Sequence, residues 1–432
     1  MPFESTPVMP KRIAVIGAGI SGMGAAHWLA DNHQVVLFEA NNRLGGHART
    51  VLAGKRGDQP VDTGFIVFNH VNYPHLTRLF EHLEVETAPS DMSFGASIDG
   101  GRIEYALSRL GALFAQRRNV LRPAYLRMIR DILHFNKHAL DTARGTDMTV
   151  GQLLSALGTG DWFRDCYLLP FSGAIWSTPT ESIMDFPADA MLRFFQNHAL
   201  LDVKGQHQWH TVRGGSIEYV RRLGQSLFSR GVDIRLNAPI AGVRRNATGV
   251  EVRAHGGDWE GFDEVIFATH SDDTLALLSD ANGLERTALG AVRYQPNSAV
   301  LHADQAIMPK RRKCWASWVY TEDRNKSSDT IDVTYWMNSL QPIPKDDPMF
   351  VTLNSTRPIR EELIYDQTTF RHPVYDRAAL AAQDVLRSHN GANKTWFCGA
   401  WMKNGFHEDG LGSAFDVVTA MAERDAAMIA AE

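Results

Sequence analysis

A glycine-rich turn near the start of the chain holds the first residues whose types and spacing point to chemistry. Gly17, Gly19 and Gly22 follow an apolar run, and Glu39 ends the next apolar run. Gly17 lets the chain turn, Gly19 lets its backbone approach a pyrophosphate, and Gly22 lets the next helix pack on the strand. The helix N-terminus offers N–H groups to phosphates, and a carboxylate at Glu39 can accept hydrogen bonds from ribose hydroxyls. This order predicts a dinucleotide site.

A second glycine pair lies close behind this turn. The segment Arg43-Leu44-Gly45-Gly46-His47 follows Glu39 after only three residues. An NAD-binding domain usually continues with an ordinary helix at this point. A basic residue followed by two glycines indicates a loop that wraps a larger cofactor.

The composition is that of a globular protein without bulk attraction to nucleic acid. The 432 residues are 44% hydrophobic and 22% charged, and the formal net charge is -5. The three cysteines, Cys166, Cys314 and Cys398, show no paired spacing, so neither a disulfide framework nor a metal site is indicated. The sequence has no signal-peptide pattern and no run of about 18 apolar residues. We therefore expect a protein of the reducing cytoplasm, with no metal and no nucleic-acid partner.

Periodicity places the glycine motifs among strands and helices. It predicts a helix over 74–83, a hairpin over 92–105, mainly helices over 110–207 and a helix over 216–229. Strands are expected over 233–236, 240–244, 250–254, 263–269 and 396–401, and a strand-rich aromatic stretch over 291–360. A glycine-rich turn over 405–412 is expected to lead into a final helix over 413–431.

The α/β pattern of the N-terminus therefore returns twice, which predicts a discontinuous nucleotide domain. We assign residues 1–90, 208–290 and 390–432 to this domain. The two intervening stretches, 91–207 and 291–389, are expected to form a substrate domain.

Several segments, in order, resemble the flavin amine oxidase superfamily. The loop after Glu39 is similar to the E-x-x-x-R-x-G-G-R segment of that superfamily, with His47 in place of the final arginine. Segments 61–69, 90–94, 113–119, 175–179, 335–338 and 405–411 resemble a subgroup of FAD-dependent oxidoreductases associated with cyclopropane-fatty-acid synthase-like methyltransferases. The chain departs from this subgroup at 411–414, where Arg and Gly are more usual at the second and fourth positions.

The resemblance implies an FAD cofactor and a fold of mixed α/β and α+β class. A Rossmann-type, discontinuous FAD-binding domain would carry a mixed sheet and helical substrate domain, as in amine oxidases. The first glycine turn would hold the pyrophosphate, Glu39 the adenosine ribose, and the second glycine pair the ribityl side. The segment 63–66 would lie along the isoalloxazine, Ile240 at the adenine and Thr269 at the phosphate side, while the C-terminal glycine turn closes over the pyrimidine end. The implied cofactor residues are Gly17, Gly19, Ser21, Gly22, Glu39, Arg43, Leu44, Gly45, Gly46, Thr63, Gly64, Phe65, Ile66, Ile240, Thr269, Gly399, Asp409, Gly410, Leu411 and Ser413.

The chemistry left for the protein is chiefly to place a C–H bond over the flavin, because the flavin itself takes up the hydride. Amine-oxidising relatives usually place a lysine opposite the flavin on a substrate-domain strand. The corresponding stretch here, 297–302, contains none. This argues against a standard amine oxidase.

Three residues are candidates for a catalytic role: His407, Glu408 and Trp401. His407 and Glu408 stand beside Asp409 in the densest titratable cluster near the expected flavin, so either is a candidate proton acceptor. Alternatively, Asp409 caps a helix and His407 packs in the interior. Trp401, with Trp176, Tyr335 and Trp336, either walls an apolar substrate channel or belongs to the core.

A basic, amphipathic stretch lies between these motifs. Arg117, Arg118, Arg122, Arg127 and Arg130 alternate with apolar residues, and Lys310–Lys313 adds a basic loop. Such a pattern fits either an anionic membrane surface or a solvated helix face.

Three hypotheses follow for the function. The leading one is an FAD-dependent oxidoreductase that dehydrogenates or oxidises a fatty acyl chain of a lipid, methylated, cyclopropane or unsaturated, met at a membrane surface. The second is an oxidase of amines or amino acids. The third is a non-catalytic, FAD-containing partner of a lipid methyltransferase, because cofactor motifs alone do not prove turnover.

Overall fold

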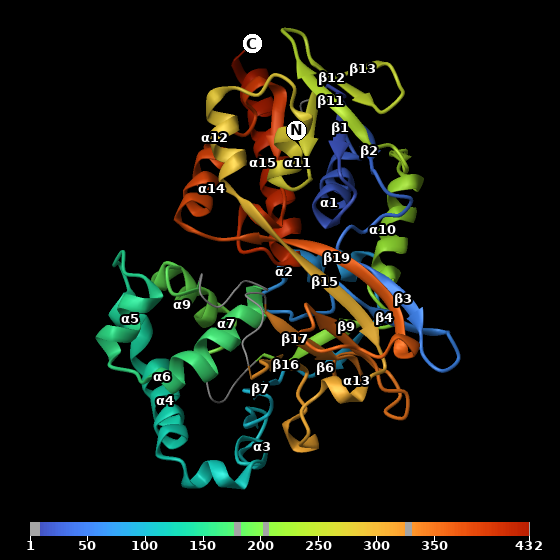
Figure 1. The fold of residues 1–432 in the computed structure, drawn as a ribbon. Helices are drawn as coiled ribbons and strands as arrows, with labels where there is room; N and C mark the ends of the chain where they lie inside the picture. Colours follow the sequence, from blue (N-terminus) through green and yellow to red (C-terminus); the bar gives the residue numbers. More distant parts are fainter. Residues whose placement is uncertain (1–8, 177–182, 202–206, 325–330, 432) are drawn as a thin grey trace, which may run out of the picture.

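The computed structural model describes residues 9–176, 183–201, 207–324 and 331–431 (Figure 1). A parallel sheet of five strands, in the order β10-β2-β1-β14-β20, forms the upper part of the molecule in this view. Each of the three segments assigned to the nucleotide domain contributes to this sheet, while the domain limits themselves stay a prediction. The strands are β1 (Arg12–Ile16), β2 (Gln34–Phe38), β10 (Asp233–Arg235), β14 (Glu264–Phe267) and β20 (Thr395–Phe397).

Helices cover both faces of this sheet because side chains alternate along its strands. On β1, Ile13 and Val15 pack into one core with α1 (Ile20–Leu29), α10 (Ile217–Ser229) and α15 (His407–Ala431). Ala14 and Ile16 pack into the opposite core. That second core includes residues of α12 (Gly283–Ala291) and α14 (Arg377–His389), and α11 (Ser271–Leu277) lies beside α12.

The final helix begins earlier than the sequence predicts. We expected a glycine-rich turn up to residue 412, but α15 starts at His407 and includes Gly410 and Gly412. A side chain at Gly410 would approach Ser21 Oγ to 2.9 Å, and one at Gly24 would approach Leu411 to 2.5 Å. The prediction of a turn over 405–412 was therefore wrong because these glycines allow α15 to pack closely on α1 instead of breaking the helix.

Three small antiparallel sheets complete the fold. One is formed by β11 (Ile240–Arg245), β12 (Val250–Ala254) and β13 (Trp259–Phe262). A second pairs β3 (Thr50–Ala53) with β4 (Gln59–Asp62). The third has the order β5-β9-β6, with β5 (Val67–Phe68), β9 (Trp209–Val212) and β6 (Thr87–Ser90), and α2 (Pro74–His82) lies between β5 and β6 in the chain.

A sheet of seven strands, β19-β15-β18-β17-β16-β7-β8, dominates the lower part. The expected hairpin over 92–105 is confirmed as β7 and β8, which pair in antiparallel fashion. The two longest strands, β15 and β19, pair along their length and run from this sheet up to the parallel one (Figure 1). The strands are β7 (Phe94–Ile98), β8 (Ile103–Ala106), β15 (Arg293–His302), β16 (Trp318–Thr321), β17 (Asp332–Trp336), β18 (Phe350–Leu353) and β19 (Ile364–Val374), with α13 (Met337–Leu340) between β17 and β18.

Helices pack against β7 and β16 at the other side of this sheet, in the region predicted to be mainly helical. They are α3 (Leu110–Leu113), α4 (Pro123–Ala143), α5 (Val150–Leu157), α6 (Asp161–Phe163), α7 (Leu169–Trp176) and α9 (Ala188–Asn197), with a 3-10 turn at Arg117–Leu121 and a π-helical turn at Arg164–Leu168. Residues 177–179 of the segment that resembles the subgroup lie outside the described residues. Among the described helices, none is both long and apolar enough to cross a membrane.

Candidate functional site

The first glycine turn has the geometry that the sequence predicts. Gly17 has φ 100°, and its N–H donates to Phe38 O at 2.8 Å, which ties the turn to β2. A Cβ at Gly22 would lie 1.8 Å from Gly17 O, so only glycine allows α1 to start here. The residue before the helix, Gly19, offers no side-chain cap, and Ser21 lies in the first turn. The N-terminus of α1 therefore keeps backbone N–H groups for an anionic ligand.

Glu39 lies at the end of β2, next to this turn. Its Oε2 accepts the N–H of Ala18 at 2.9 Å, and its Oε1 accepts both the N–H and the amide nitrogen of Asn41. The side of the site predicted for adenine lies close by, because the N–H of Ala238 donates to Glu39 O at 2.9 Å. Ile240, two residues further on, begins β11 and is buried. A ribose hydroxyl can still reach a remaining lone pair of the carboxylate.

The second glycine pair folds directly onto the first turn. Gly45 donates to Ala18 O at 2.8 Å, and a Cβ at Gly46 would lie 3.0 Å from Gly19 Cα. The Arg43 guanidinium donates to Gly46 O at 2.8 Å and so braces the loop from within. Leu44 packs toward α10, where a Cβ at Gly224 would meet it at 2.9 Å. The two motifs therefore form one backbone cradle.

The segment predicted to follow the isoalloxazine runs beside this loop. A Cβ at Gly64 would lie 1.9 Å from His47 O, and the N–H of Phe65 donates to the same oxygen at 3.0 Å. Thr63 donates its N–H to Arg49 O at 2.8 Å. Ile66 packs against an apolar core that includes residues of the seven-stranded sheet.

Residues from the C-terminal part close the cradle from the other side. Ser413 Oγ accepts the N–H of Gly399 at 2.8 Å and donates to Gly410 O at 2.8 Å. Gly410 and Leu411 contact the N-terminal half of α1, as the close approaches at Ser21 and Gly24 indicate. Thr269 lies next to the first glycine turn, since a Cβ at Gly17 would approach its Cγ2 to 3.2 Å. The predicted cofactor residues thus come together from both ends of the chain.

The three candidate catalytic residues have different surroundings. His407 stacks on Phe65 with ring centroids 3.9 Å apart, and its Nε2 lies 2.6 Å from the hydroxyl oxygen of Tyr219. Burial lowers the pKa of His407 to about 3, so the imidazole is neutral at physiological pH. This residue stays a candidate proton acceptor beside the predicted isoalloxazine segment.

Glu408 and Trp401 have structural roles. The Glu408 carboxylate accepts the N–H groups of His75 and Leu76 at 2.9 and 3.0 Å, and so caps the N-terminus of α2. Trp401 is 2% exposed and donates its indole N–H to Thr269 O at 3.0 Å. These contacts favour the structural interpretation of both side chains, and the catalytic assignment of Glu408 and Trp401 stays a prediction.

Asp409 behaves as the capping interpretation expects. Its Oδ2 accepts the N–H of Phe406 at 2.9 Å, one residue before α15 begins. Burial raises the pKa of this carboxyl to about 6. Asp409 therefore stabilises the helix end that faces the cradle.

The sequence reasoning missed a cluster of histidines next to the cradle. His47, His270 and His372 lie together, with the ring centroid of His47 5.6 Å from that of His270 and 5.8 Å from that of His372. Burial lowers the pKa of His270 and of His372 to about 3. Asn297, the first residue of the stretch without a lysine, places its amide nitrogen 2.8 Å from His372 Nδ1. The unusual His47 at the end of the glycine loop was the one signal in the sequence.

Asp62 is a second residue that the sequence reasoning missed. Fully buried, it accepts hydrogen bonds from Thr50, from the backbone and hydroxyl of Ser216, and from Gln341. Burial raises the pKa of Asp62 to about 6. It joins the start of α10 to Gln341, which directly follows α13, and it stands one residue before the isoalloxazine segment.

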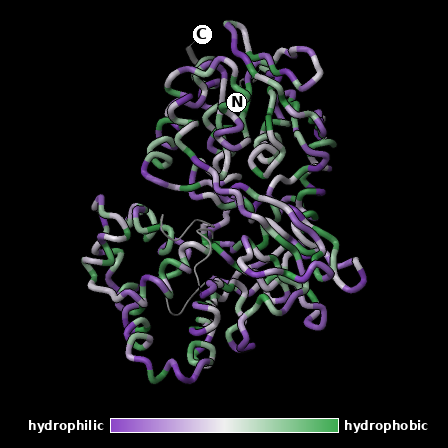
Figure 2. The backbone as a smooth tube through the Cα atoms, in the orientation of Figure 1, coloured by the Kyte–Doolittle hydropathy of each residue, from purple (hydrophilic) through white to green (hydrophobic). Residues whose placement is uncertain are grey.

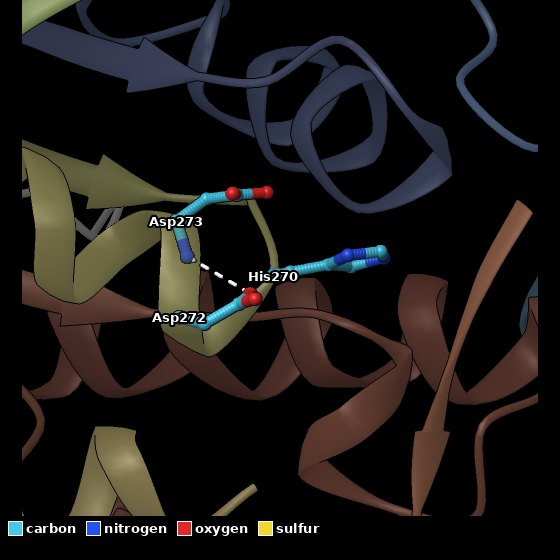
Figure 3. A group of neighbouring side chains, drawn as sticks. All are labelled: His270, Asp272 and Asp273. Carbon is cyan, nitrogen blue, oxygen red and sulfur yellow. Dashed lines mark hydrogen bonds between the residues drawn. The ribbon is translucent and has the colours of Figure 1, made fainter. Parts of the chain in front are cut away.

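One group of side chains has the composition of a metal site. Ligand atoms of His270, Asp272 and Asp273, at the start of α11, lie within 4.8 Å of one another (Figure 3). Arg371 pairs with both carboxylates, reaching Asp272 at 2.6 Å. The arginine thus compensates the negative charge that would attract a cation, and the group forms a bridge between α11 and β19.

A mostly apolar pocket opens beside the cradle, between the helical region and β15 and β19. Its apolar wall consists of Trp176, Ile183, Phe186, Met191, Val374 and Tyr375. Arg293, Asp376 and Asp185 are the charged residues of the lining, and Arg293 pairs with Asp376 at 2.9 Å. Val374 stands two residues after His372 on β19, so both side chains leave the strand on the same side. A Cβ at Gly405 would lie 2.8 Å from the Tyr375 hydroxyl, which connects the pocket to the start of α15.

Comparison with known proteins agrees with this geometry. The family model of flavin containing amine oxidoreductases matches residues 20–339, and the chain belongs to this family. It is an FAD-dependent oxidoreductase: the cradle fits FAD, the family is one of flavin containing oxidoreductases, and the structural neighbours include oxidases. Association with the cyclopropane-synthase subgroup stays a prediction.

Individual relatives are more distant. The chain is 46% identical to the L-amino-acid oxidase BjussuLAAO-I of Bothrops jararacussu over 54 residues, which are 12% of this chain and only 11% of that relative. The CLA-producing fatty acid isomerase from P. acnes has a TM-score of 0.68 at 14% identity, over 95% of this chain and 98% of that one. Cyclohexylamine oxidase from Brevibacterium oxydans has a TM-score of 0.68 at 14% identity, over 96% of this chain and 99% of that one. At such identity the two structures establish the shared fold.

Proposed function

We propose that this flavoprotein oxidises or dehydrogenates a fatty acyl chain. The observation that carries the proposal is the pocket beside the cradle. Its wall is apolar apart from Asp185, Arg293 and Asp376. Its volume of about 200 Å³ is below the usual range for drug-sized ligands, so it suits part of a chain better than a whole lipid. The P. acnes fatty acid isomerase supports the proposal, since its fold is the same.

The described residues would orient the chain and keep water away from it. Trp176, Phe186 and Met191 would hold methylene groups by burying them. Arg293 can bind a carboxylate or phosphate in place of Asp376. FAD, when bound, supplies the hydride acceptor. His407, which stacks on Phe65 beside the predicted isoalloxazine segment, would be placed to accept the proton that leaves the adjacent carbon.

Oxidation of an amine is the second candidate. The exposed Asp185 at the pocket, together with Asp376, would attract an ammonium group. The stretch that begins at Asn297 has no lysine, and the amide of Asn297 is occupied by His372 and Asn354. The lysine that usual amine oxidases place there therefore has no equivalent on this strand, which favours the acyl substrate.

The test is anaerobic reduction of the purified holoprotein by two panels, one of fatty acids and phospholipids and one of amines and amino acids. We expect lipids to bleach the flavin and amines to leave it oxidised. Val374→Phe, which fills the pocket, should slow bleaching by lipid, and Arg293→Gln should raise KM for free fatty acids more than it lowers kcat. Val71→Phe on the exposed surface is the matched control. If only the amine panel bleaches the flavin, the amine oxidase hypothesis replaces the proposal. If neither panel bleaches it, the non-catalytic role is favoured.

A further inference from the structure

One end of the molecule combines exposed leucines with arginines. This end is formed by α3, the 3-10 turn at Arg117–Leu121 and the first part of α4, at the bottom of Figure 1 and far from the parallel sheet. Hydrophobic and hydrophilic stretches alternate along it in Figure 2. We call it the arginine–leucine surface, and it consists of Arg109, Leu110, Arg117, Arg118, Val120, Leu121, Arg122, Leu126, Arg127, Arg130 and Leu133.

The apolar side chains of this surface are unusually exposed. Leu121 is 85% exposed, Leu110 77% and Leu133 53%. Six of the 17 large apolar side chains that are exposed among the described residues fall within 107–133. Single exposed leucines are ordinary, but such a concentration on one end marks a surface that is covered by something apolar.

The same surface carries positive charge with little compensation. Residues 105–130 contain six arginines and no aspartate or glutamate. Asp131 contacts both Arg127 and Arg130, at 3.5 and 3.4 Å. In the described part of the chain, no carboxylate pairs with Arg117 or Arg118, and Arg118 donates instead to the carbonyl of Arg102 at 2.6 Å. Such guanidinium groups are available to phosphates.

The basic loop over 310–313 extends this charge. The turn at Arg312–Cys314 lies against α3, although the two segments are far apart in the sequence. Arg311 is used internally, because it pairs with the buried Glu104 at 2.6 Å. Arg312 and Lys313 are exposed and add to the same end of the molecule.

We propose that the arginine–leucine surface docks on a bilayer that contains anionic phospholipids. The leucines would enter the boundary between headgroups and acyl chains, while the arginines bind lipid phosphates. An anionic bilayer matches both the positive charge of this surface and its exposed apolar side chains. A nucleic acid would pair with the arginines but leave Leu110 and Leu121 in water. The docking itself depends on this surface alone, so it can hold even if the proposed acyl substrate is wrong.

Cosedimentation of the holoprotein with vesicles tests the proposal. We expect binding to phosphatidylcholine mixed with phosphatidylglycerol, weak binding to phosphatidylcholine alone, and release by salt. Each arginine near an anionic bilayer changes partitioning about fivefold. The double variant Arg117→Glu/Arg118→Glu should therefore lower binding by at least about twentyfold. Leu110→Ser/Leu121→Ser should lower it without a change of charge.

Matched controls lie elsewhere on the molecule. Arg286→Glu on α12 and Leu52→Ser on β3 replace exposed residues of the same types and should leave vesicle binding unchanged. FAD content and melting temperature verify that every variant is folded. The proposal is overturned if the holoprotein does not bind anionic vesicles, or if the arginine variant binds them as strongly as the wild type does. If the leucine variant binds anionic vesicles as well as the wild type does, and the protein binds DNA equally well, the surface binds polyanions in general and the proposal is also overturned.

Discussion

Replacing Glu39 by glutamine tests how the cradle holds FAD. Glu39 is 8% exposed and its carboxylate accepts three hydrogen bonds, one from Ala18 and two from Asn41. Glutamine has one acceptor oxygen and one donor group. The amide nitrogen that replaces one carboxylate oxygen therefore cannot accept the hydrogen bonds which that oxygen accepted. Hydrogen bonds to a charged group contribute roughly 1.5–3 kcal/mol each. Loss of one such bond to the ribose should raise the Kd for FAD roughly 10- to 150-fold.

The assay is titration of the apoprotein with FAD, followed by flavin fluorescence. Glu39→Gln should also lower the stability of the apoprotein. Melting curves with and without saturating FAD therefore separate this effect from the change in FAD affinity. Asn41→Ala keeps the carboxylate and loses only one of the two Asn41 bonds, so its Kd should change less than about threefold. Glu86→Gln on the exposed surface should change nothing. Wild-type affinity in Glu39→Gln would refute the assignment of Glu39 to the ribose.

Three further substitutions test the surroundings of the cradle. Gly22→Val should give protein without FAD, because a Cβ there would lie 1.8 Å from Gly17 O, and the flavin-to-protein ratio after purification measures this. Asp62→Ala should lower the free energy of unfolding by about 3 kcal/mol, since it leaves several buried donors without an acceptor; denaturant titration measures the loss, and a loss below about 1 kcal/mol contradicts the role. Burial raises the pKa of Glu408 to about 7, so the wild type should lose stability as pH rises from about 4.5 to 7, and Glu408→Gln should flatten this dependence; parallel curves would contradict it.

The glycine turn, Glu39 and the second glycine pair could be predicted because their geometry is local. A tight turn needs glycine wherever it occurs, and the close approach at Gly22 is set by the carbonyl oxygen of Gly17 within the same turn. The alternation of Ile13 and Val15 with Ala14 and Ile16 similarly fixes a strand buried on both faces.

The missed features depend on partners far away in the chain. Glu408 caps α2, which lies more than 300 residues earlier, and Asp62 meets Gln341, which follows α13 and is 279 residues away. Gly410 suggests a turn until α1 is seen to pack against it. Trp401 shows the same limit, because an aromatic residue near a predicted site suits a channel wall and a core equally well until its burial is known.

The central claim, removal of hydrogen from an acyl chain, is tested most directly by an anaerobic mass balance. The holoprotein is mixed with lipid in the absence of oxygen, flavin reduction is followed near ~450 nm, and the acyl chains are then analysed by mass spectrometry. We expect one acyl chain lighter by two hydrogens for each flavin reduced. Flavin that stays oxidised, or flavin that is reduced while every acyl chain keeps its mass, would contradict it.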